Sequence, residues 1–292
     1  MTELFVCLTF DHDNVSAAIA RGFTTPTIMS RGDFGIAATR RILDLLKDHK
    51  IPTTWFIPGH TIETYPSCAA SVAKAGHEIG HHGWTHRTPA SLGREGEERE
   101  LERGNEEIKK LTGRYARGYR SPAWDLSPYT VDLLLKHGFE YDSSMMGHDY
   151  LPYQAREGDV VTLEDPMVYG ADTALVEMPI SWSLDDFPVF EYMRFDNGIL
   201  PGLMNAGLVL ENWTNDFIYM RDHYDWGILT YTFHPHVIGR GHRMMILEKL
   251  IRTVRDAGAV FLTMEEALAE YRRKYPTGRS ERGRAVQDKG PA

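Results

Sequence analysis

Along most of the chain, short continuous runs of apolar residues alternate with segments whose apolar residues recur at helical spacing. The first run, Leu4 to Leu8, predicts a buried strand, and residues 35–49 predict a helix. Further strands are predicted at 52–58, 77–80, 119–124, 139–142, 227–233 and 260–263, and further helices at 65–75, 94–112, 128–137, 208–223 and 244–257. This order indicates an α/β fold, a parallel sheet wrapped by helices, with a barrel as its natural closure.

Three segments depart from this rhythm. Residues 94–112 are rich in charge and have a narrow apolar stripe, which indicates a solvated helix. Residues 146–205 contain many Pro, Gly and Asp residues, so we expect long loops that cover a pocket. Residues 277–292 are rich in Gly and Arg with almost no apolar content and are predicted to be a disordered tail, which leaves residues 1–276 as a single catalytic barrel domain.

Composition narrows the possible partners. The chain has 292 residues, 42% of them hydrophobic, and can bury a large core. A net charge of −9 argues against nucleic acid, and no stretch is long enough for a membrane span. Without a visible export signal we expect a soluble, cytoplasmic protein. Cys7 and Cys68 are the only cysteines, so we expect core packing and no disulfide.

Polar residues fall at the ends of successive predicted strands, where α/β folds place their chemistry. They are Asp11 and Asp13, His82 and His86, Arg120, and His234. A single His-x-x-x-His pair is weak evidence, since His77 and His81 form another, but the strand-end placement strengthens it. Two imidazoles and a carboxylate suit Zn²⁺ or a similar divalent ion and leave a position open for catalysis. The second carboxylate could act as a base held ionised by a bidentate contact with Arg120, and His234 could protonate a leaving nitrogen.

These residues resemble the polysaccharide deacetylase family of metal-dependent amide hydrolases. The similar segments are Leu8 to Asp13, His82 to His86, Arg120 to Trp124, Tyr141 to Ser144, and Phe233 to Pro235. The resemblance implies a distorted (β/α) barrel with about seven parallel strands. It also implies Asp13, His82 and His86 as metal ligands, Asp11 as base and His234 as acid.

One departure within this resemblance points to a particular branch. Extracellular sugar deacetylases usually have adjacent aspartates, whereas His12 separates Asp11 from Asp13 here. Because a strand alternates faces, both carboxylates should still lie on one side. Residues 150–153 and 177–188 resemble a branch of cyclic imide hydrolases, allantoinase-like and peptidoglycan deacetylase-like enzymes. That branch implies a homo-oligomer, typically a tetramer.

The chemistry predicted is hydrolysis of a non-peptide C–N bond, and the preferred substrate is a small cyclic imide or related cyclic amide. The missing export signal and a lidded pocket favour it over the alternative, an N-acetylated sugar or peptidoglycan fragment. A non-catalytic barrel that binds a small molecule is the second alternative. Trp124 and Trp182 are either pocket walls or core, and Asp185 and Asp186 either bind substrate or cap a turn. The native metal stays open among zinc, cobalt, nickel, iron and manganese.

Overall fold

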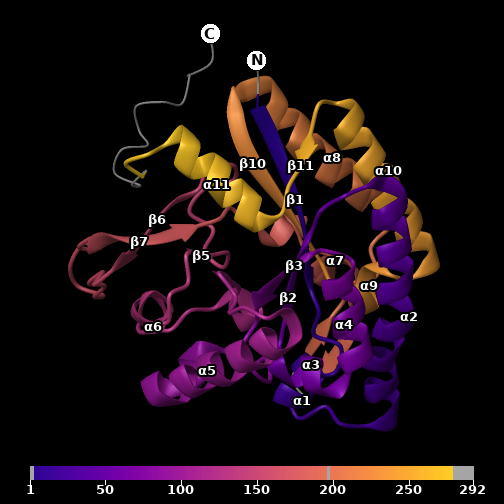
Figure 1. The fold of residues 1–292 in the computed structure, drawn as a ribbon, viewed down its shortest axis with the longest axis horizontal. Helices are drawn as coiled ribbons and strands as arrows, with labels where there is room; N and C mark the ends of the chain where they lie inside the picture. The colour runs from indigo at the N-terminus through magenta and orange to yellow at the C-terminus, as the bar shows by residue number, and fades with distance from the viewer. Residues whose placement is uncertain (1–2, 196–197, 279–292) are drawn as a thin grey trace.

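The protein is built on one curled, mostly parallel sheet, seen in a computed structural model that describes residues 3–195 and 198–278 (Figure 1). The strand order is β10-β1-β2-β3-β4-β5-β7-β6, and β11 pairs with β1 beside this path. Only β6 and β7 pair antiparallel within this sheet. The strands are β1 (Glu3–Asp11), β2 (Thr54–Ile57), β3 (Glu78–His81), β4 (Gly118–Tyr119), β5 (Tyr141–Asp142), β6 (Tyr153–Glu157), β7 (Ala171–Glu177), β10 (Trp226–Phe233) and β11 (Val260–Phe261). A separate hairpin pairs β8 (Met193–Phe195) with β9 (Gly198–Leu200).

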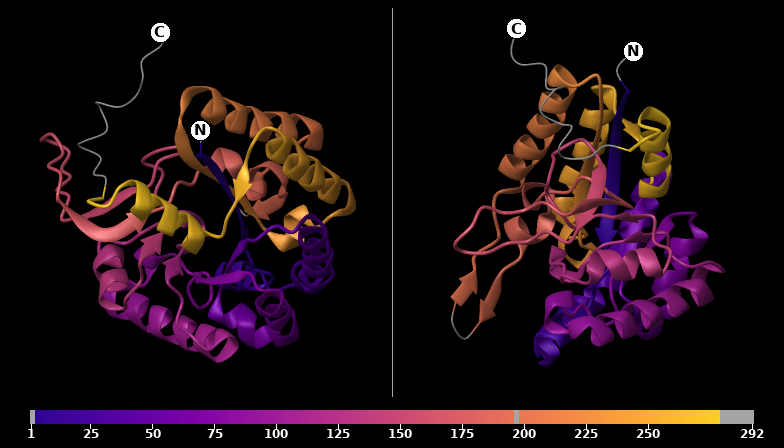
Figure 2. Two further views of the ribbon diagram at one scale, coloured as in Figure 1. Left: turned by 45° about the horizontal axis from the view of Figure 1, so that its top comes forward. Right: turned by 90° about the vertical axis from the view of Figure 1, so that its left-hand side faces the viewer.

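Helices surround the curled sheet, as the view with the top turned forward shows (Figure 2). The larger ones are α2 (Pro26–His49), α4 (Pro66–Lys74), α5 (Gly93–Thr112), α8 (Ala206–His223), α10 (Gly241–Asp256) and α11 (Met264–Lys274). The shorter ones are α1 (Ser16–Ala20), α3 (Gly59–Thr64), α6 (Thr130–Lys136), α7 (Asp186–Phe190) and α9 (Pro235–Ile238), with 3₁₀ turns at Pro89–Ser91, Pro122–Trp124 and Trp182–Leu184. Among the described helices, none combines the length and apolarity that a membrane crossing requires.

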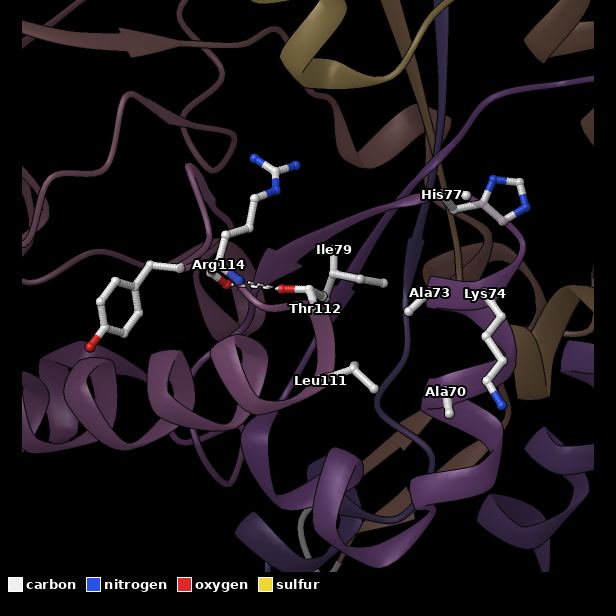
Figure 3. A pocket seen from close by; sticks show the side chains of 10 residues that line it. Ala70, Ala73, Lys74, His77, Ile79, Leu111, Thr112 and Arg114 are labelled. Carbon is white, nitrogen blue, oxygen red and sulfur yellow. Dashed lines mark hydrogen bonds between the residues drawn. The ribbon is translucent and has the colours of Figure 1, made fainter.

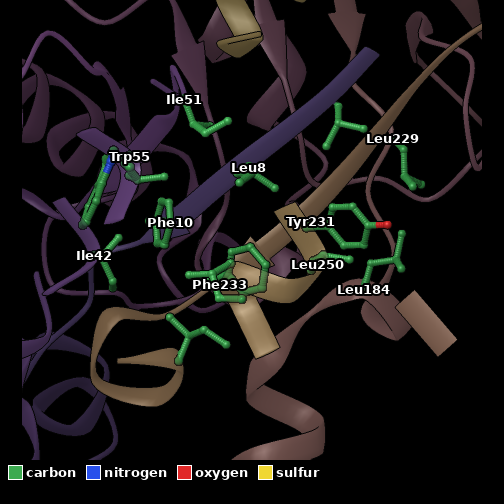
Figure 4. Close-up of a cluster of buried hydrophobic side chains, with 14 of the residues drawn as sticks. Leu8, Phe10, Ile42, Ile51, Trp55, Leu184, Leu229, Tyr231, Phe233 and Leu250 are labelled. Carbon is green, nitrogen blue, oxygen red and sulfur yellow. The ribbon is translucent and has the colours of Figure 1, made fainter. Parts of the chain in front are cut away.

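The core lies between the long central strands and the helices that cover them (Figure 4). Strand β1 pairs with β10, β2 and β11, and all its residues after Glu3 are buried. A strand covered on both faces reads as a continuous apolar run, which explains the pattern from Leu4 to Leu8. Phe10 stacks on Trp55 with ring centroids 4.4 Å apart and also contacts Phe233. This packing fixes the carboxyl end of β1, where Asp11 lies.

The predicted α/β barrel is confirmed as a curled sheet that stays open between β10 and β6 among the described strands. The prediction of long loops over 146–205 was wrong in part, because β6, β7, α7 and the β8–β9 hairpin lie there. Strand β7 is buried only over its last three residues, so no apolar alternation marks it. Of the predicted tail 277–292, residues 279–292 lie outside the described residues.

The solvated character predicted for residues 94–112 was also wrong in part. The helix forms as α5, but Glu97 and Glu100 are buried and bind neighbouring loops. Glu97 accepts hydrogen bonds from Ser127 and Thr130. Buried glutamates on a helix therefore hold loops here, which a count of charges along the sequence does not reveal.

Asp142 and Glu177 form a buried carboxyl pair where β5 and β7 end side by side. Glu177 Oε1 accepts the backbone N–H groups of Ser144 and Met145, and Asp142 Oδ1 accepts the Ser144 hydroxyl. The remaining oxygens, Asp142 Oδ2 and Glu177 Oε2, find no other partner in the described structure, so a shared proton satisfies both. Burial raises the pKa of Asp142 to about 6, and burial and the Asp142 charge raise that of Glu177.

We expect Glu177→Gln to weaken the dependence of stability on pH. A carboxyl whose pKa is higher in the folded chain stabilises the fold below its unfolded pKa, and this contribution is lost as pH rises through the folded pKa. The wild type should therefore lose about 1–3 kcal/mol of unfolding free energy between pH 4 and pH 8 from this pair. The glutamine amide can donate to Asp142 at every pH, so the variant should lose less.

Urea denaturation at several pH values measures this difference. Glu164→Gln, at an exposed position on the loop between β6 and β7, is the matched control and should follow the wild type. Parallel pH profiles for wild type and Glu177→Gln would contradict the shared proton.

Candidate active site

The carboxyl edge of the sheet brings together the candidate residues that the sequence separates. Asp11 ends β1 and Asp13 follows it, while His82, Arg120 and His234 come directly after β3, β4 and β10. All of them except Arg120, which lies behind Asp11, line a cavity of about 180 Å³. The cavity is lined by Asp11, Asp13, His82, His86, Trp124, Trp182, Asp185 and His234, among others.

Asp13, His82 and His86 form a buried cluster with the geometry of a metal site. One potential ligand atom from each lies within 4.8 Å of the others. His82 Nε2 is 3.4 Å from Asp13 Oδ1, and His86 Nε2 is 3.2 Å from Asp13 Oδ2. The carbonyl of Arg120 accepts a hydrogen bond from His82 Nδ1–H at 2.7 Å, which turns the Nε2 lone pair toward Asp13. Asp13 Oδ1 and His82 Nε2 are buried without a hydrogen-bond partner among the described residues, as expected for atoms that would bind a cation.

Helix α5 holds the loop that carries the two histidines. Glu100 Oε2 accepts the backbone N–H groups of Trp84 and Thr85. Gly104 lets the helix approach closely, because a Cβ there would lie 2.4 Å from the His81 ring and 2.9 Å from the Gly83 carbonyl. Glu100 is therefore a positioning residue that the sequence did not reveal, since its charge looks like one of many on this helix.

Asp11 is held by Arg120 on one side and by Trp124 on the other. Arg120 NH1 donates to Asp11 Oδ1 at 2.8 Å, and Trp124 Nε1 donates to Oδ2 at 3.3 Å. The expected bidentate contact was wrong, because the other guanidinium nitrogens bind Ser143. Burial alone would raise the pKa of Asp11, but the charges of Arg120, His82 and His234 lower it, so the carboxylate is ionised at neutral pH.

His234 faces Asp13 from the side opposite Arg120 and is fixed by Asp186. Its Nδ1 donates to Asp186 Oδ1 at 2.8 Å, and its Nε2 lies 3.8 Å from Asp13 Oδ2. Burial lowers the pKa of His234, but the hydrogen bond with Asp186 and the charges of both neighbouring aspartates raise it to about 10. The imidazole is therefore held as a proton donor whose Nε2 faces the cavity. Asp185 also caps α7 by accepting the N–H of Phe187.

Of the remaining candidates, the two tryptophans lie at the cavity and His12 lies away from it. Trp124 and Trp182 both line the cavity, Trp124 8% exposed and Trp182 56% exposed at its rim. His12 points the other way, with Nε2 3.3 Å from Thr39 Oγ1 and 3.7 Å from Cys68 Sγ. Asp11 and Asp13 therefore face the cavity while His12 faces away from it, as expected from the alternation of side chains along a strand.

Another hollow, of about 350 Å³, lies at the opposite end of the sheet between α4 and α5 (Figure 3). It is lined by residues such as Lys74, His77, Thr112 and Arg114, and no carboxylate lines it. His77 precedes β3, so this hollow lies at the amino end of that strand, away from the chemistry.

The chain is similar in sequence to known proteins along most of its length. The polysaccharide deacetylase family profile matches residues 3–141. The peptidoglycan deacetylase of Helicobacter pylori is 33% identical over 288 residues, which cover 94% of this chain and 98% of that protein. The chain belongs to the polysaccharide deacetylase family. A peptidoglycan deacetylase-like protein of Gibberella zeae is 27% identical over 91% of this chain and 86% of its own.

Solved structures of the family agree along nearly the whole chain. A Mycobacterium smegmatis protein assigned to the polysaccharide deacetylases superposes with a TM-score of 0.81 at 30% identity, covering 96% of this chain and 93% of its own. The Puue allantoinase superposes with a TM-score of 0.76 at 18% identity over 94% and 92% of the two chains, a similarity of fold. The deacetylase is thus an enzyme that hydrolyses amide bonds, and the comparisons favour the N-acetylated sugar over the cyclic imide, for which they give no support. The residue roles and the oligomer stay predictions.

We expect Asp186→Asn to lower the pKa of His234. The substitution removes the nearest negative charge while an amide oxygen can still accept from Nδ1, so the imidazolium loses its main stabilisation. NMR titration of the imidazole measures the shift. Asp185→Asn is the matched control, since Asp185 lies 3.5 Å from Nδ1, and should shift it less. An unchanged titration in Asp186→Asn would refute the assigned partner.

Proposed function

We propose that this deacetylase removes the acetyl group from an N-acetylated sugar of peptidoglycan or a related polysaccharide. The observation that supports this most is its end-to-end similarity to a peptidoglycan deacetylase, 33% identical over 98% of that protein. The proposal is supported by the carboxyl edge of the sheet, where side chains that could serve as metal ligands, base and acid line one cavity. All three are needed to hydrolyse an acetamide.

Asp13, His82 and His86 would hold the divalent ion. The fit rests on their mutual distances and on the two buried atoms without partners. One carboxylate and two imidazoles suit zinc best, with cobalt, nickel, iron or manganese as related ions. When bound, the ion polarises the acetyl carbonyl and acidifies water.

Asp11 and His234 would divide the proton transfers. The ionised Asp11 accepts a proton from the attacking water as the water oxygen bonds to the acetyl carbon. His234 donates a proton from Nε2 to the sugar nitrogen as the C–N bond breaks, which yields acetate and a free amine. Arg120 keeps Asp11 ionised and oriented, and Asp186 does the same for the protonated His234.

Trp124 and Trp182 would form the walls that hold the sugar. Trp124 reaches Asp11 through Nε1 and so places its ring beside the base. The exposed face of Trp182 at the rim suits a sugar ring, whose C–H face packs on aromatic surfaces.

Substrate choice can be measured directly on the purified protein. We expect acetate release from N-acetylglucosamine oligomers or peptidoglycan fragments, and little ring opening of succinimide or allantoin. Removal of the metal with a chelator should abolish acetate release, and added Zn²⁺ should restore it. Turnover of the cyclic imide alone would overturn the proposal.

We expect Asp11→Asn and Asp13→Ala to separate the base from the metal site. Asp11→Asn should lower kcat by about 10²–10⁴-fold with the metal content retained, because a general base is lost. Asp13→Ala should lose bound metal as well, as elemental analysis would show. Asp48→Asn, on the exposed face of α2, is the matched control. Full activity in Asp11→Asn would remove it as the base.

A further inference from the structure

A third cavity, of about 480 Å³, lies beside α2 and is lined by several charged side chains. Its charged lining consists of Arg31, Arg240, Arg243 and Glu191, and the rest is apolar, with Ile28 and Met193 among the side chains. We call it the arginine groove. Three guanidinium groups face one carboxylate, so the groove is positive in a protein whose net charge is −9.

The arginine groove lies close to the active-site cavity. A small chamber of about 30 Å³ lies between them and shares Arg21 and Phe187 with the active-site cavity. The chamber shares Ile28, Arg31, Glu191 and Met193 with the arginine groove. The groove is therefore the neighbouring cavity for a substrate that extends beyond the active site.

The guanidinium groups in the groove are short of partners. Within residues 3–195 and 198–278, Arg240 makes no hydrogen bond or ion pair through its side chain and stacks on Phe34, 3.7 Å from the ring centroid. Arg243 is 6% exposed and donates to the carbonyls of Val237 and Phe190, while its Nε has no partner in the described structure. Arg31 pairs with Glu191. Burial and the charges of Arg240 and Arg243 lower the pKa of Arg31, so positive charges crowd this groove.

The chamber between the two cavities also contains buried polar atoms without a hydrogen-bond partner in the described structure. Asn14 and His236 line it and are buried, and among the described residues no partner is found for either side-chain atom of Asn14 or for Nδ1 of His236. Buried polar groups normally have partners. These unpaired polar atoms lie between the active-site cavity and the arginine groove.

We propose that the arginine groove binds a carboxylate carried by the substrate and so selects acidic N-acetylated sugars over neutral ones. This inference rests on the proposed function. In peptidoglycan the sugar chain bears lactyl-linked peptides with free carboxylates, whereas chitin-type oligomers carry no charge. Guanidinium groups bind carboxylates through charge-assisted hydrogen bonds, and the apolar walls suit the peptide's side chains.

Kinetics with matched acidic and neutral substrates test the proposal. The enzyme is assayed with N-acetylmuramyl dipeptide and with neutral N-acetylglucosamine oligomers. Arg240→Gln should reduce kcat/KM for the acidic substrate about tenfold through KM, because a charge-assisted contact remote from the reacting bond is lost. Its kcat/KM for the neutral oligomers should not change. Arg240→Lys should recover part of the loss, and Arg40→Gln, at an exposed position of the same helix α2 as Arg31, should match the wild type.

Equal effects on both substrates, or no effect on either, would overturn the carboxylate site. If the wild type releases acetate from neither substrate, the proposed function fails and ligand binding decides about the groove. N-acetylmuramyl dipeptide should then raise the melting temperature of the wild type and leave that of Arg240→Gln unchanged. Equal shifts, or no shift in the wild type, would reject the groove as an anion site.

Discussion

The buried ion pair between Arg120 and Asp11 is the contact on which the site depends. Arg120 is fully buried at the end of β4, and a buried charge is costly unless it is paired and hydrogen-bonded. Asp11, Thr9 and Ser143 supply those bonds, from β1 and from the residue after β5. Since the Arg120 carbonyl also orients His82, one residue aligns three strand ends and links Asp11 to the cluster of Asp13, His82 and His86.

The regular part of the fold could be predicted because burial leaves a periodic trace. The run at Leu4 to Leu8 and the stripe of residues 35–49 belong to elements covered by the core, and both were found. Helix α2 begins at Pro26, before the predicted start at residue 35. The prediction missed its first turns because they are largely exposed and carry no apolar stripe. Strands β6 and β7 were missed for the same reason, since β7 is held by backbone pairing and half of it faces solvent.

The candidate site likewise contains residues that the sequence could place and residues that it could not. Asp11, Asp13, His82 and Arg120 could be placed together because parallel strands end at a common edge. Asp186 and Glu100 could not, because a loop and a helix bring them to the site through tertiary contacts that no spacing records. The cyclic imide preference relied on an absent export signal, and an absent signal says nothing about the ring or chain that a cavity accepts.

The segment from Asp185 to Met193 connects chemistry with recognition. Asp185 forms a parallel bridge with Thr232 of β10, which places Asp186 beside His234. The next residue, Phe187, lines both the active-site cavity and the chamber, and Glu191 pairs with Arg31 in the arginine groove. Because one short helix, α7, spans these contacts, a ligand that displaces Glu191 from Arg31 acts on the element that holds the proton donor. Under the proposed function, a substitution between Asp185 and Met193 can therefore alter substrate selection while Asp13, His82 and His86 stay the same.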